Sequence, residues 1–384
     1  MKVLIVHPHM DVFGGAETVI TKLASFLLKK DVETSILTLS VNSKILEKYE
    51  KFHIITPNKK YSHNLRSTSI YNALGLINEI NALRNHVNNN IDDYSLVNVH
   101  NFPATWSIFP NPKPVIWTAN EPPDLWNNQN PSLLLKLLFS VGQTADKTIV
   151  NRSIKSICVA DEFNANRIIA RYNRYPRIIP YGIDYDFYSK GNERKAIEKF
   201  SLDNNYVLLQ AGWITPQKNQ FESIKTIFQL RVEIPEIKLI LAGSDDTPYA
   251  YKMKKYVKDN DLENNVIFSG HINKELMKSL YHSCDVLLHP VRSQGGWLAP
   301  FEALCASKTV IVSPEMTASN IIRNNDFGIV TQSFVRMVTE VYHNPEKFHS
   351  MAKIGSKFVK EQLTWDNFCE KTFQEYQSAN NDKS

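Results

Sequence analysis

Short apolar strands alternate with amphipathic helices along nearly the whole chain, and this alternation restricts the fold more than any other feature. The first apolar run, residues 3–6, leads into a helix whose Val19, Ile20, Leu23, Ala24, Leu27 and Leu28 form one stripe. We expect further strands at residues 35–39, 53–56, 96–99, 115–118, 147–150, 156–159, 206–210, 238–242, 266–268, 286–288 and 309–312. The pattern predicts an α/β protein with doubly wound parallel sheets covered by helices on both faces.

The length of the chain and one irregular segment predict two domains. A chain of 384 residues exceeds one ordinary core. Residues 182–204 are charged and lack periodicity, so we place a hinge there between domains at residues 1–181 and 205–362. Residues 363–384 form a helix that we expect to pack back on the N-terminal domain. Since ligands of open parallel sheets bind at the carboxyl ends of the strands, two such sheets facing a central cleft would present loops from both domains.

Two glycines follow the first strand, at the start of the striped helix. Gly14 and Gly15 allow the backbone to approach a ligand closely, and a helix N-terminus favours an anion such as a diphosphate. The loop does not match the G-x-G-x-x-G fingerprint, which disfavours a nicotinamide-dependent enzyme. A tight turn between a strand and a helix is the alternative interpretation.

Two loops in the second half also join a strand to a helix. The first carries Gly212 and, in the first turn of the helix, Lys218. A lysine there can hold a phosphate as a point charge, although exposure to solvent would also explain it. The second runs from Gln294 to Glu302 and leads into a helix whose first turn carries Glu302. Its backbone N–H groups suit a phosphate and its carboxylate suits sugar hydroxyls. A tight turn is again the alternative.

Charge and cysteine usage limit the partners and the compartment. The net charge of +5, with a pI near 8.8, suits anionic ligands or an anionic membrane surface but does not indicate nucleic acid. Four scattered cysteines without metal-type spacing indicate free thiols in a reducing compartment. No apolar run reaches the roughly 20 residues of a membrane span. We expect a cytoplasmic protein, and peripheral contact at the inner face of the cell membrane is a further hypothesis. The residues that would contact the membrane form a basic edge of the first domain: Arg167, Arg171, Arg174 and Arg177. A face exposed only to solvent is the alternative interpretation of these arginines.

Five short motifs occur in an order that resembles one enzyme family. They are Gly14-Gly15-Ala16-Glu17, Pro180-Tyr181-Gly182-Ile183-Asp184, Gly212 with Lys218, Phe268-Ser269-Gly270-His271, and the run that ends at Glu302-Ala303. In this order they resemble the retaining nucleotide-sugar glycosyltransferases of family GT4, over nearly the whole chain. The resemblance implies a GT-B architecture of two Rossmann-like domains, with the acceptor bound mostly by the first and the nucleotide sugar mostly by the second.

The resemblance also implies roles for individual residues. Glu302 would bind the ribose hydroxyls and Lys218 the diphosphate. Further donor contacts would come from Gly14 and Gly15, from Gly212 and Trp213, from Gly270, His271 and Ile272 beside the base, and from the backbone of Gly295, Gly296 and Trp297. One cation and several N–H groups can stabilise a leaving nucleoside diphosphate without a metal. The implied enzyme is metal-independent and needs no cofactor beyond its nucleotide-sugar substrate.

Three positions depart from the family pattern. Trp213 stands where the family usually has an arginine, Gln294 replaces the first glutamate of a carboxylate pair, and Asn120 stands where many members have a histidine. An amide brings neither a negative charge nor a proton carrier. A retaining transfer in which the acceptor hydroxyl gives its proton to the departing phosphate depends mainly on positioning and charge stabilisation. The catalytic candidates are therefore Lys218, Glu302, Gln294 and Asn120.

Two residues are candidates for contact with the acceptor. Glu121 follows Asn120, and His100 ends a strand of the first domain. A structural carboxylate and a hydrogen-bonded structural histidine are equal alternatives. Trp117, Trp126 and Trp297 have the side chains to stack on sugar rings, although packing is the commoner role of such aromatics.

The motifs together predict a hexosyltransferase of polysaccharide or glycoconjugate biosynthesis. It would move a hexose from a nucleotide diphosphate sugar to a hydroxyl of a glycan or lipid-linked acceptor. The main alternative is a non-catalytic GT-B protein that binds a glycan or supports a partner glycosyltransferase, because three family positions are changed. An epimerase acting on the nucleotide sugar is disfavoured, since Gln294 removes an acidic group that such a reaction would need.

Overall fold

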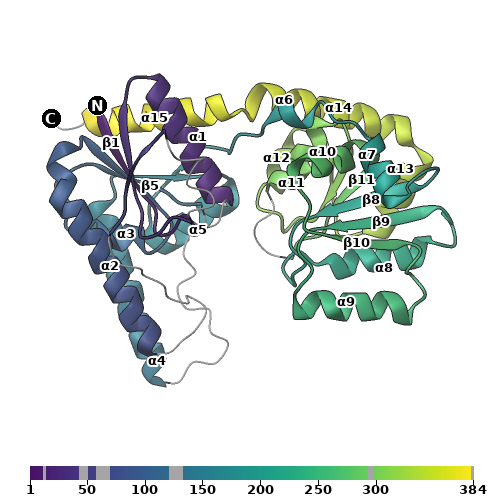
Figure 1. Cartoon of the computed structure of the whole chain (residues 1–384), viewed down its shortest axis with the longest axis horizontal. Coiled ribbons are helices and arrows are strands. Elements are labelled where there is room, and N and C mark those ends of the chain that lie inside the picture. Colours follow the sequence, from purple (N-terminus) through teal and green to yellow (C-terminus); the bar gives the residue numbers. More distant parts are fainter. Residues whose placement is uncertain (12–13, 43–50, 58–69, 121–132, 293–296, 382–384) are drawn as a thin grey trace. The chain divides into compact units, whose positions relative to one another are not determined.

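The chain folds into two compact α/β units in the computed structural model. The structure describes residues 1–11, 14–42, 51–57, 70–120, 133–292 and 297–381. The first unit comprises Met1–Tyr181 and Trp365–Ser384, and the second comprises Gly182–Thr364 (Figure 1). The segment expected as a hinge belongs to the second unit, where it includes the short helices α6 (Tyr185–Tyr188) and α7 (Arg194–Phe200).

A parallel sheet forms the centre of the first unit. Its described strands are β1 (Lys2–Val6), β2 (Glu33–Leu37), β3 (His53–Ile55), β4 (Leu96–His100), β5 (Val115–Thr118), β6 (Ser156–Val159) and β7 (Arg177–Ile178), in the order β3-β2-β1-β4-β5-β6-β7. The central β1 is paired on both sides, with Val3 opposite Thr34 in β2 and Leu96 in β4. Its apolar residues are buried because helices cover both faces of the sheet.

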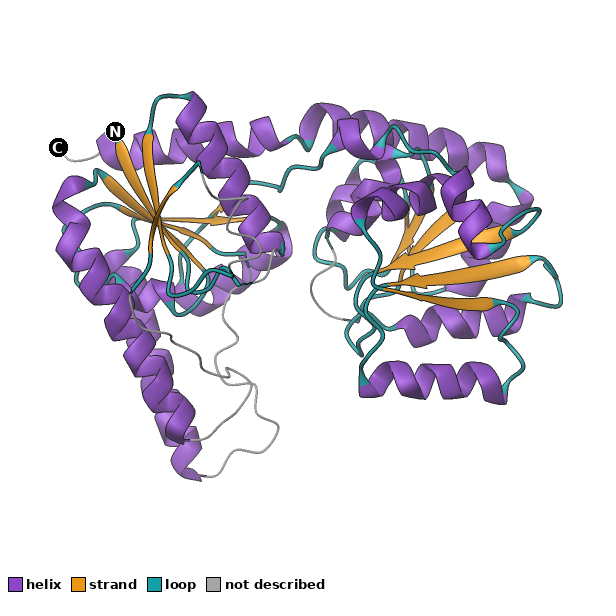
Figure 2. Cartoon of the chain, viewed as in Figure 1, coloured by secondary structure: helices purple, strands orange, loops and turns teal. Residues whose placement is uncertain are grey.

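Two helical layers cover this sheet (Figure 2). One layer contains α1 (Gly15–Lys29) and α15 (Trp365–Asn381), whose apolar residues share a buried cluster. The other contains α2 (Ile70–Asn90), a 3-10 turn (Ile91–Asp93), α3 (Ala104–Ser107), α4 (Leu133–Ser153) and α5 (Glu162–Tyr172). The stripe expected on the first helix is confirmed except at Leu28, which is 38% exposed. The last helix of the chain thus completes the core of the first unit.

A second parallel sheet forms the centre of the second unit. Its described strands are β8 (Tyr206–Ala211), β9 (Ile237–Ala242), β10 (Val266–Gly270), β11 (Val286–His289), β12 (Thr309–Val312) and β13 (Ile329–Val330), in the order β10-β9-β8-β11-β12-β13. Helices α8 (Gln220–Leu230) and α9 (Pro248–Asp259) cover one face, and α10 (Lys274–Ser283), α11 (Leu298–Cys305) and α12 (Ser319–Asn324) cover the other (Figure 1). Helix α13 (Phe334–His343) packs against α8, and α14 (Pro345–Gln362) packs against α11. Both Rossmann-like sheets predicted from the alternation are present.

One expected strand is wrong. Residues 147–150 lie inside α4, where Asp146 and Val150 are buried four residues apart and Lys147 and Thr148 are exposed. That spacing belongs to one face of a helix, and a four-residue apolar run cannot distinguish it from a strand. The two-residue strands β7 and β13 were too short for the sequence pattern to indicate them.

The arginines expected to form a basic edge on the first unit have partners within the unit. Arg171 pairs with the buried Asp146 at 2.8 Å, and Arg177 pairs with Glu375 of α15 at 3.2 Å. Arg174 donates to backbone carbonyls at the end of α4. These contacts give three of the arginines a structural role, so they lend no support to contact with a membrane.

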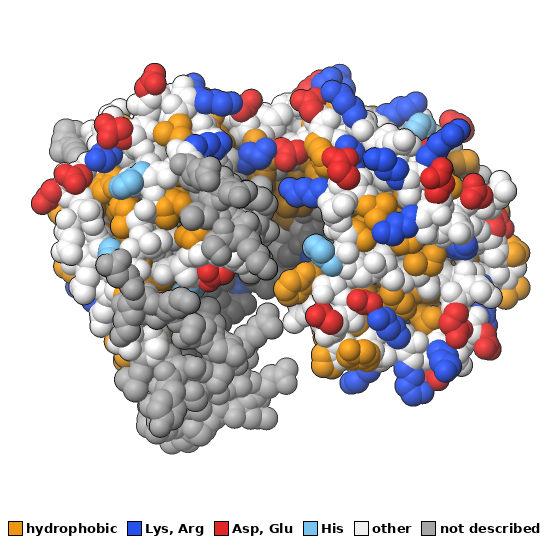
Figure 3. Space-filling model, viewed as in Figure 1, with side chains coloured by type: hydrophobic (Ala, Val, Ile, Leu, Met, Phe, Trp, Pro, Cys, Tyr) orange, Lys and Arg blue, Asp and Glu red, His pale blue; other side chains and the backbone are white. Residues whose placement is uncertain are grey.

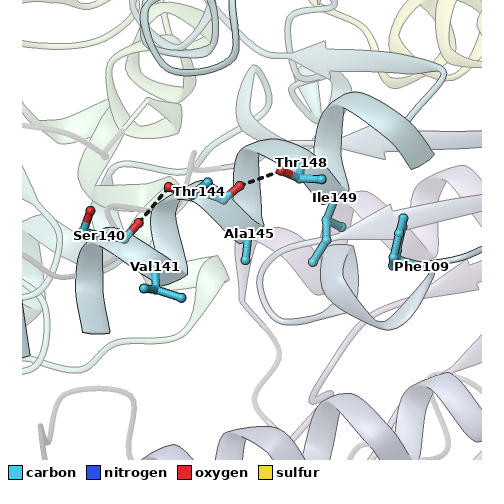
Figure 4. Close-up of a pocket in the computed structure, with 7 residues that line it drawn as sticks. All are labelled: Phe109, Ser140, Val141, Thr144, Ala145, Thr148 and Ile149. Carbon is cyan, nitrogen blue, oxygen red and sulfur yellow. Dashed lines mark hydrogen bonds between the residues drawn. The ribbon is translucent and has the colours of Figure 1, made fainter. Parts of the chain in front are cut away.

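The surface of the described residues has a mixed character in each unit. On the visible face of the second unit, basic and acidic side chains are interspersed (Figure 3). The first unit has a shallow hollow of about 510 Å³, lined by Phe109, Ser140, Val141, Thr144, Ala145, Thr148 and Ile149 (Figure 4). The hydroxyls of its two threonines bond to carbonyls of their own helix. Within the described residues, no helix combines the length and the apolar content that a membrane crossing requires.

Candidate functional site

The second sheet has a topological switch point between β8 and β11. These strands are neighbours, but the chain leaves β8 toward β9 and leaves β11 toward β12, so the connections run in opposite directions. Ligands of open α/β sheets bind at the carboxyl ends of the strands at such a point. The loop from Gly212 to Lys218 follows β8, and the connection to α11 follows β11.

Glycines bring the backbones of neighbouring loops together at this edge of the sheet. Gly212 has a φ of 135° and Gly270 a φ of 67°, a conformation that favours glycine. Gly243 follows β9, and a Cβ atom there would lie 2.1 Å from the carbonyl oxygen of Gly212. Sequence reasoning identified Gly212 and Gly270 but not Gly243, whose constraint arises only from the neighbouring loop. The exposed His271 and the half-buried Ile272 follow β10 at the same edge.

Lys218 lies in a loop that is anchored on several sides. Its backbone carbonyl accepts a hydrogen bond from the buried Gln210 side chain at 2.7 Å, and its methylene chain lies beside Gly212. The Asn219 side chain donates to the carbonyl of Pro290, after β11, at 3.0 Å. Helix α8 begins only at Gln220, so Lys218 precedes the helix and does not occupy its first turn as we expected. The anchored loop fixes the base of this side chain at the switch point.

Glu302 lies on α11 and is held by two tyrosines. The helix begins at Leu298, so Glu302 is in its second turn and not in the first. Tyr281 donates to Glu302 Oε2 at 2.7 Å, and the Tyr188 hydroxyl lies near the same carboxylate and lowers its pKa. Burial raises the pKa of Glu302 above its ordinary value, although both tyrosines and Lys274 oppose that shift. The side chain keeps some exposed surface, which leaves room for a ligand hydroxyl.

The tryptophans differ in their exposure. Trp213, which follows Gly212, is 63% exposed. Trp297 is only 6% exposed and packs on Phe301 with ring centroids 4.8 Å apart. Trp117 is fully buried against Tyr172. The last two side chains therefore pack in the core and are not platforms for sugar rings, while the backbone of Trp297 stands at the N-cap of α11.

Gly14 and Gly15 open α1 in the first unit. The N–H group of Gly14 donates to Glu17 Oε2 at 2.9 Å, so it caps its own helix. Although burial raises the pKa of Glu17, hydrogen bonds from His7 and the backbone lower it overall. Gly15 has open space where a side chain would stand. The tight-turn interpretation accounts for Gly14, and only Gly15 offers a close approach to a ligand.

His100 is the last residue of β4 and has no exposed surface. Its Nε2 atom lies 2.7 Å from the Oδ1 atom of Asn98, which is also buried. Burial, with a smaller contribution from His7, holds the pKa of His100 well below its ordinary value, so the ring is neutral. The structure thus gives His100 the position of a hydrogen-bonded structural histidine.

Asn120 follows β5 and its amide is engaged at both ends. Its Nδ2 donates to Asn101 Oδ1 at 3.0 Å, and its Oδ1 accepts from the Tyr181 hydroxyl at 3.0 Å. Asn120, in the loop after β5, therefore links Asn101, in the loop after β4, to Tyr181. The remaining candidates Gln294, Gly295, Gly296 and Glu121, with Trp126, lie outside the described residues.

His289 and the two tyrosines around Glu302 were not indicated by the sequence. His289 ends β11 and is fully buried, and among the described residues neither ring nitrogen has a hydrogen-bond partner. Burial, with a contribution from the charge of Lys218, lowers its pKa to about 3, so the ring is neutral. Tyr188 and Tyr281 come from α6 and α10, and no local motif marks them. No group of three or more metal-ligating side chains is arranged for a metal in the described part of the chain.

Two family models match the chain in succession. The model described as Glycosyltransferase Family 4 matches residues 13–187, and the model described as Glycosyl transferases group 1 matches residues 192–358. The two matches together take in most of both units.

Characterised and uncharacterised glycosyltransferases share limited sequence identity with this chain. An uncharacterized glycosyltransferase of Methanocaldococcus jannaschii is 24% identical over 66% of this chain and 65% of its own length. The lipopolysaccharide 1,2-N-acetylglucosaminetransferase of Salmonella typhimurium is 22% identical over 50% of this chain and 54% of its own. A GDP-mannose-dependent phosphatidylinositol monomannoside mannosyltransferase of Mycolicibacterium smegmatis is 25% identical over 49% and 52%. The matches thus span about half to two thirds of these relatives.

Solved structures match over almost the whole chain. Alr3699/HepE of Anabaena, solved in complex with UDP, has a TM-score of 0.78 at 15% identity and covers 98% of this chain and 100% of its own. WaaG, a glycosyltransferase involved in lipopolysaccharide biosynthesis, has a TM-score of 0.72 at 17% identity, with 96% and 98% covered. At such identities the likeness shows the fold, which is GT-B.

Proposed function

The chain belongs to the family 4 glycosyltransferases of the GT-B fold, and on that premise we propose that it is a retaining hexosyltransferase. Its donor is a nucleotide diphosphate sugar, and its acceptor is a hydroxyl of a glycan or of a lipid-linked oligosaccharide. We place this reaction in the cytoplasm, in the assembly of a polysaccharide or glycoconjugate.

One observation carries the proposal: a cation and a carboxylate lie after adjacent strands at the switch point of the second sheet. Lys218 is anchored beyond β8, beside Gly212, and Glu302 stands on the helix that follows β11. A diphosphate needs a positive charge, and ribose hydroxyls need an acceptor. The pair therefore suits the two ends of a nucleoside diphosphate.

The residues present suit a transfer that depends on charge stabilisation more than on a strong base. In the proposed step the acceptor oxygen bonds to the anomeric carbon while the bond from that carbon to the phosphate oxygen breaks. The acceptor proton passes to the departing phosphate, so no protein base is consumed. Lys218 would stabilise the charge that grows on the leaving diphosphate. An asparagine at position 120 is compatible with this step, and we propose that no metal ion takes part.

The names of the relatives support a nucleotide-sugar donor without selecting its base. One relative depends on GDP-mannose and another transfers N-acetylglucosamine, while HepE was solved with UDP-glucose. A screen of UDP-, GDP-, ADP- and dTDP-sugars by thermal shift is therefore the first experiment. Stabilisation by one of them, followed by product analysis, would support the proposal.

Replacing Glu302 with alanine is expected to weaken nucleotide-sugar binding about 10- to 100-fold, because the ribose hydroxyls lose a charged acceptor. Isothermal calorimetry with the donor found in the screen measures this loss. The exposed Glu263, in the loop between α9 and β10, supplies the control, and Glu263→Ala should bind as the wild type does. Unchanged binding by Glu302→Ala would contradict the assignment of this site.

A non-catalytic GT-B protein is the second candidate function. The exposed Trp213, in place of a family arginine, favours it because the expected phosphate cation is missing and an aromatic surface is present. Such a protein would bind a glycan and gain no stability from any nucleotide in the screen. The screen thus separates the two candidates before any acceptor is known.

A further inference from the structure

The carboxylate of Glu302 has a protein donor and a second tyrosine beside it before any ligand arrives. Tyr281 of α10 donates to it at 2.7 Å, and the Tyr188 hydroxyl of α6 is close enough to lower its pKa. The two rings pack edge to face with centroids 5.7 Å apart, and they are 1% and 6% exposed. Burial and the neighbouring carboxylate raise the pKa values of both phenols, so both side chains remain neutral.

The two segments that carry these tyrosines are joined by side-chain hydrogen bonds. The N–H group of Gly191, just after α6, donates to His282 Nε2 at 2.9 Å. The N–H group of Ala196 in α7 donates to Ser279 Oγ at 3.0 Å. A Cβ atom at Gly191 would lie 2.0 Å from the His282 ring, so only glycine allows this contact. The α10 helix therefore fixes the chain that follows Tyr188.

Charged and titratable groups face Glu302 from three elements. Lys274 of α10 favours the ionised carboxylate, whereas Asp184, at the N-cap of α6, opposes it. Cys305 lies one turn further along α11. Burial acts against ionisation more strongly than any of these groups, and the tyrosine hydrogen bonds are the largest contribution in the opposite direction.

We propose that Tyr281 and Tyr188 are positioning residues of the nucleotide-sugar site, which hold the Glu302 carboxylate in the orientation and the ionised form that accept the ribose hydroxyls. This inference rests on the proposed function. A carboxylate offers about four lone-pair positions, so it can accept two tyrosine hydroxyls and still accept the ligand. Without the tyrosines, the carboxylate would be free to rotate and would take up a proton at a higher pH.

The test compares Tyr281→Phe and Tyr188→Phe with a matched control. Phenylalanine keeps each ring and removes only the hydroxyl. Tyr206→Phe is the control, because the Tyr206 hydroxyl has no hydrogen-bond partner in the described part of the structure. Calorimetric titration with UDP-glucose and with GDP-mannose is repeated between about pH 5 and pH 8. It gives the affinity and its acid limb, which is the pH range over which the affinity falls on acidification.

Both variants should bind the nucleotide sugar about tenfold more weakly near neutral pH, with the loss of affinity on acidification shifted to higher pH. The shift is to higher pH because binding needs the ionised carboxylate, and removing a tyrosine hydroxyl raises the pKa of Glu302. Tyr206→Phe should match the wild type in affinity and in its acid limb. A melting temperature close to that of the wild type would show that both variants fold.

Three results would overturn the inference. Unchanged affinity in both tyrosine variants would do so, and so would weaker binding with an unshifted acid limb, since that is the result of a purely structural role. A Tyr206→Phe variant with the same shift would also do so. If the wild type binds none of the nucleotide sugars in the screen, or if Glu302→Ala binds as well as the wild type does, the proposed function or its site assignment fails together with the inference. If only the tyrosine variants give such a result, and Glu302→Ala still loses affinity, the inference fails but the proposed function stands.

Discussion

Replacing Lys218 with alanine is expected to slow sugar transfer by about 100- to 1,000-fold, with a smaller loss of donor binding. The charge on the leaving diphosphate grows as its bond to the sugar breaks, so a fixed cation stabilises the transition state more than the bound substrate. Trp213 stands where the family has an arginine, which increases the share of this task that falls to Lys218. Steady-state release of nucleoside diphosphate measures the effect as a fall in kcat.

Two controls sharpen this prediction. Lys218→Arg keeps the charge but not the compact ammonium, and should recover part of the lost rate. Lys225→Ala removes a lysine of the following helix that pairs with Glu222 at 2.7 Å, and it should leave kcat unchanged. A Lys218→Ala enzyme that retains most of its kcat would show that another group stabilises the leaving phosphate.

The fold and part of the second unit's site could be predicted because their signals are local. The loop from Gly212 to Lys218 lies between an apolar strand and an amphipathic helix, so a few consecutive residues reveal the strand end, the glycine and the cation. Glu302 follows the same logic after β11. The boundaries were less accurate, since α11 begins at Leu298 and α8 begins after Lys218.

The remaining features depend on contacts between distant segments. The need for glycine at position 243 comes from the carbonyl of Gly212, which no neighbour in the sequence reveals. The tyrosines that hold Glu302 lie on α6 and α10, and α6 belongs to a segment that looks like a charged linker in sequence. His100 ends a strand, as an exposed site histidine would, and its burial depends on the packing around β4.

The buried Asp146 of α4 provides the strongest prediction about stability. Its side chain is 1% exposed and accepts hydrogen bonds from Trp106 at 2.8 Å, from Tyr172 at 2.7 Å and from Arg171 at 2.8 Å. Arg171 is the only cation that the described residues place in an ion pair with it. The network joins α3, α4 and α5 on one face of the first sheet.

Arg171→Ala is expected to lower the free energy of unfolding of the first unit by about 3–5 kcal/mol, because it leaves a buried carboxylate without its counter-ion. Urea denaturation followed by circular dichroism and tryptophan fluorescence measures this loss. Tyr172→Phe removes one neutral donor from the same carboxylate and should cost about 1–3 kcal/mol. The exposed Arg152 of α4 gives the control, and Arg152→Ala should change the stability by less than about 0.5 kcal/mol. Equal stabilities for Arg171→Ala and Arg152→Ala would mean that the two hydrogen-bond donors alone compensate the charge of Asp146.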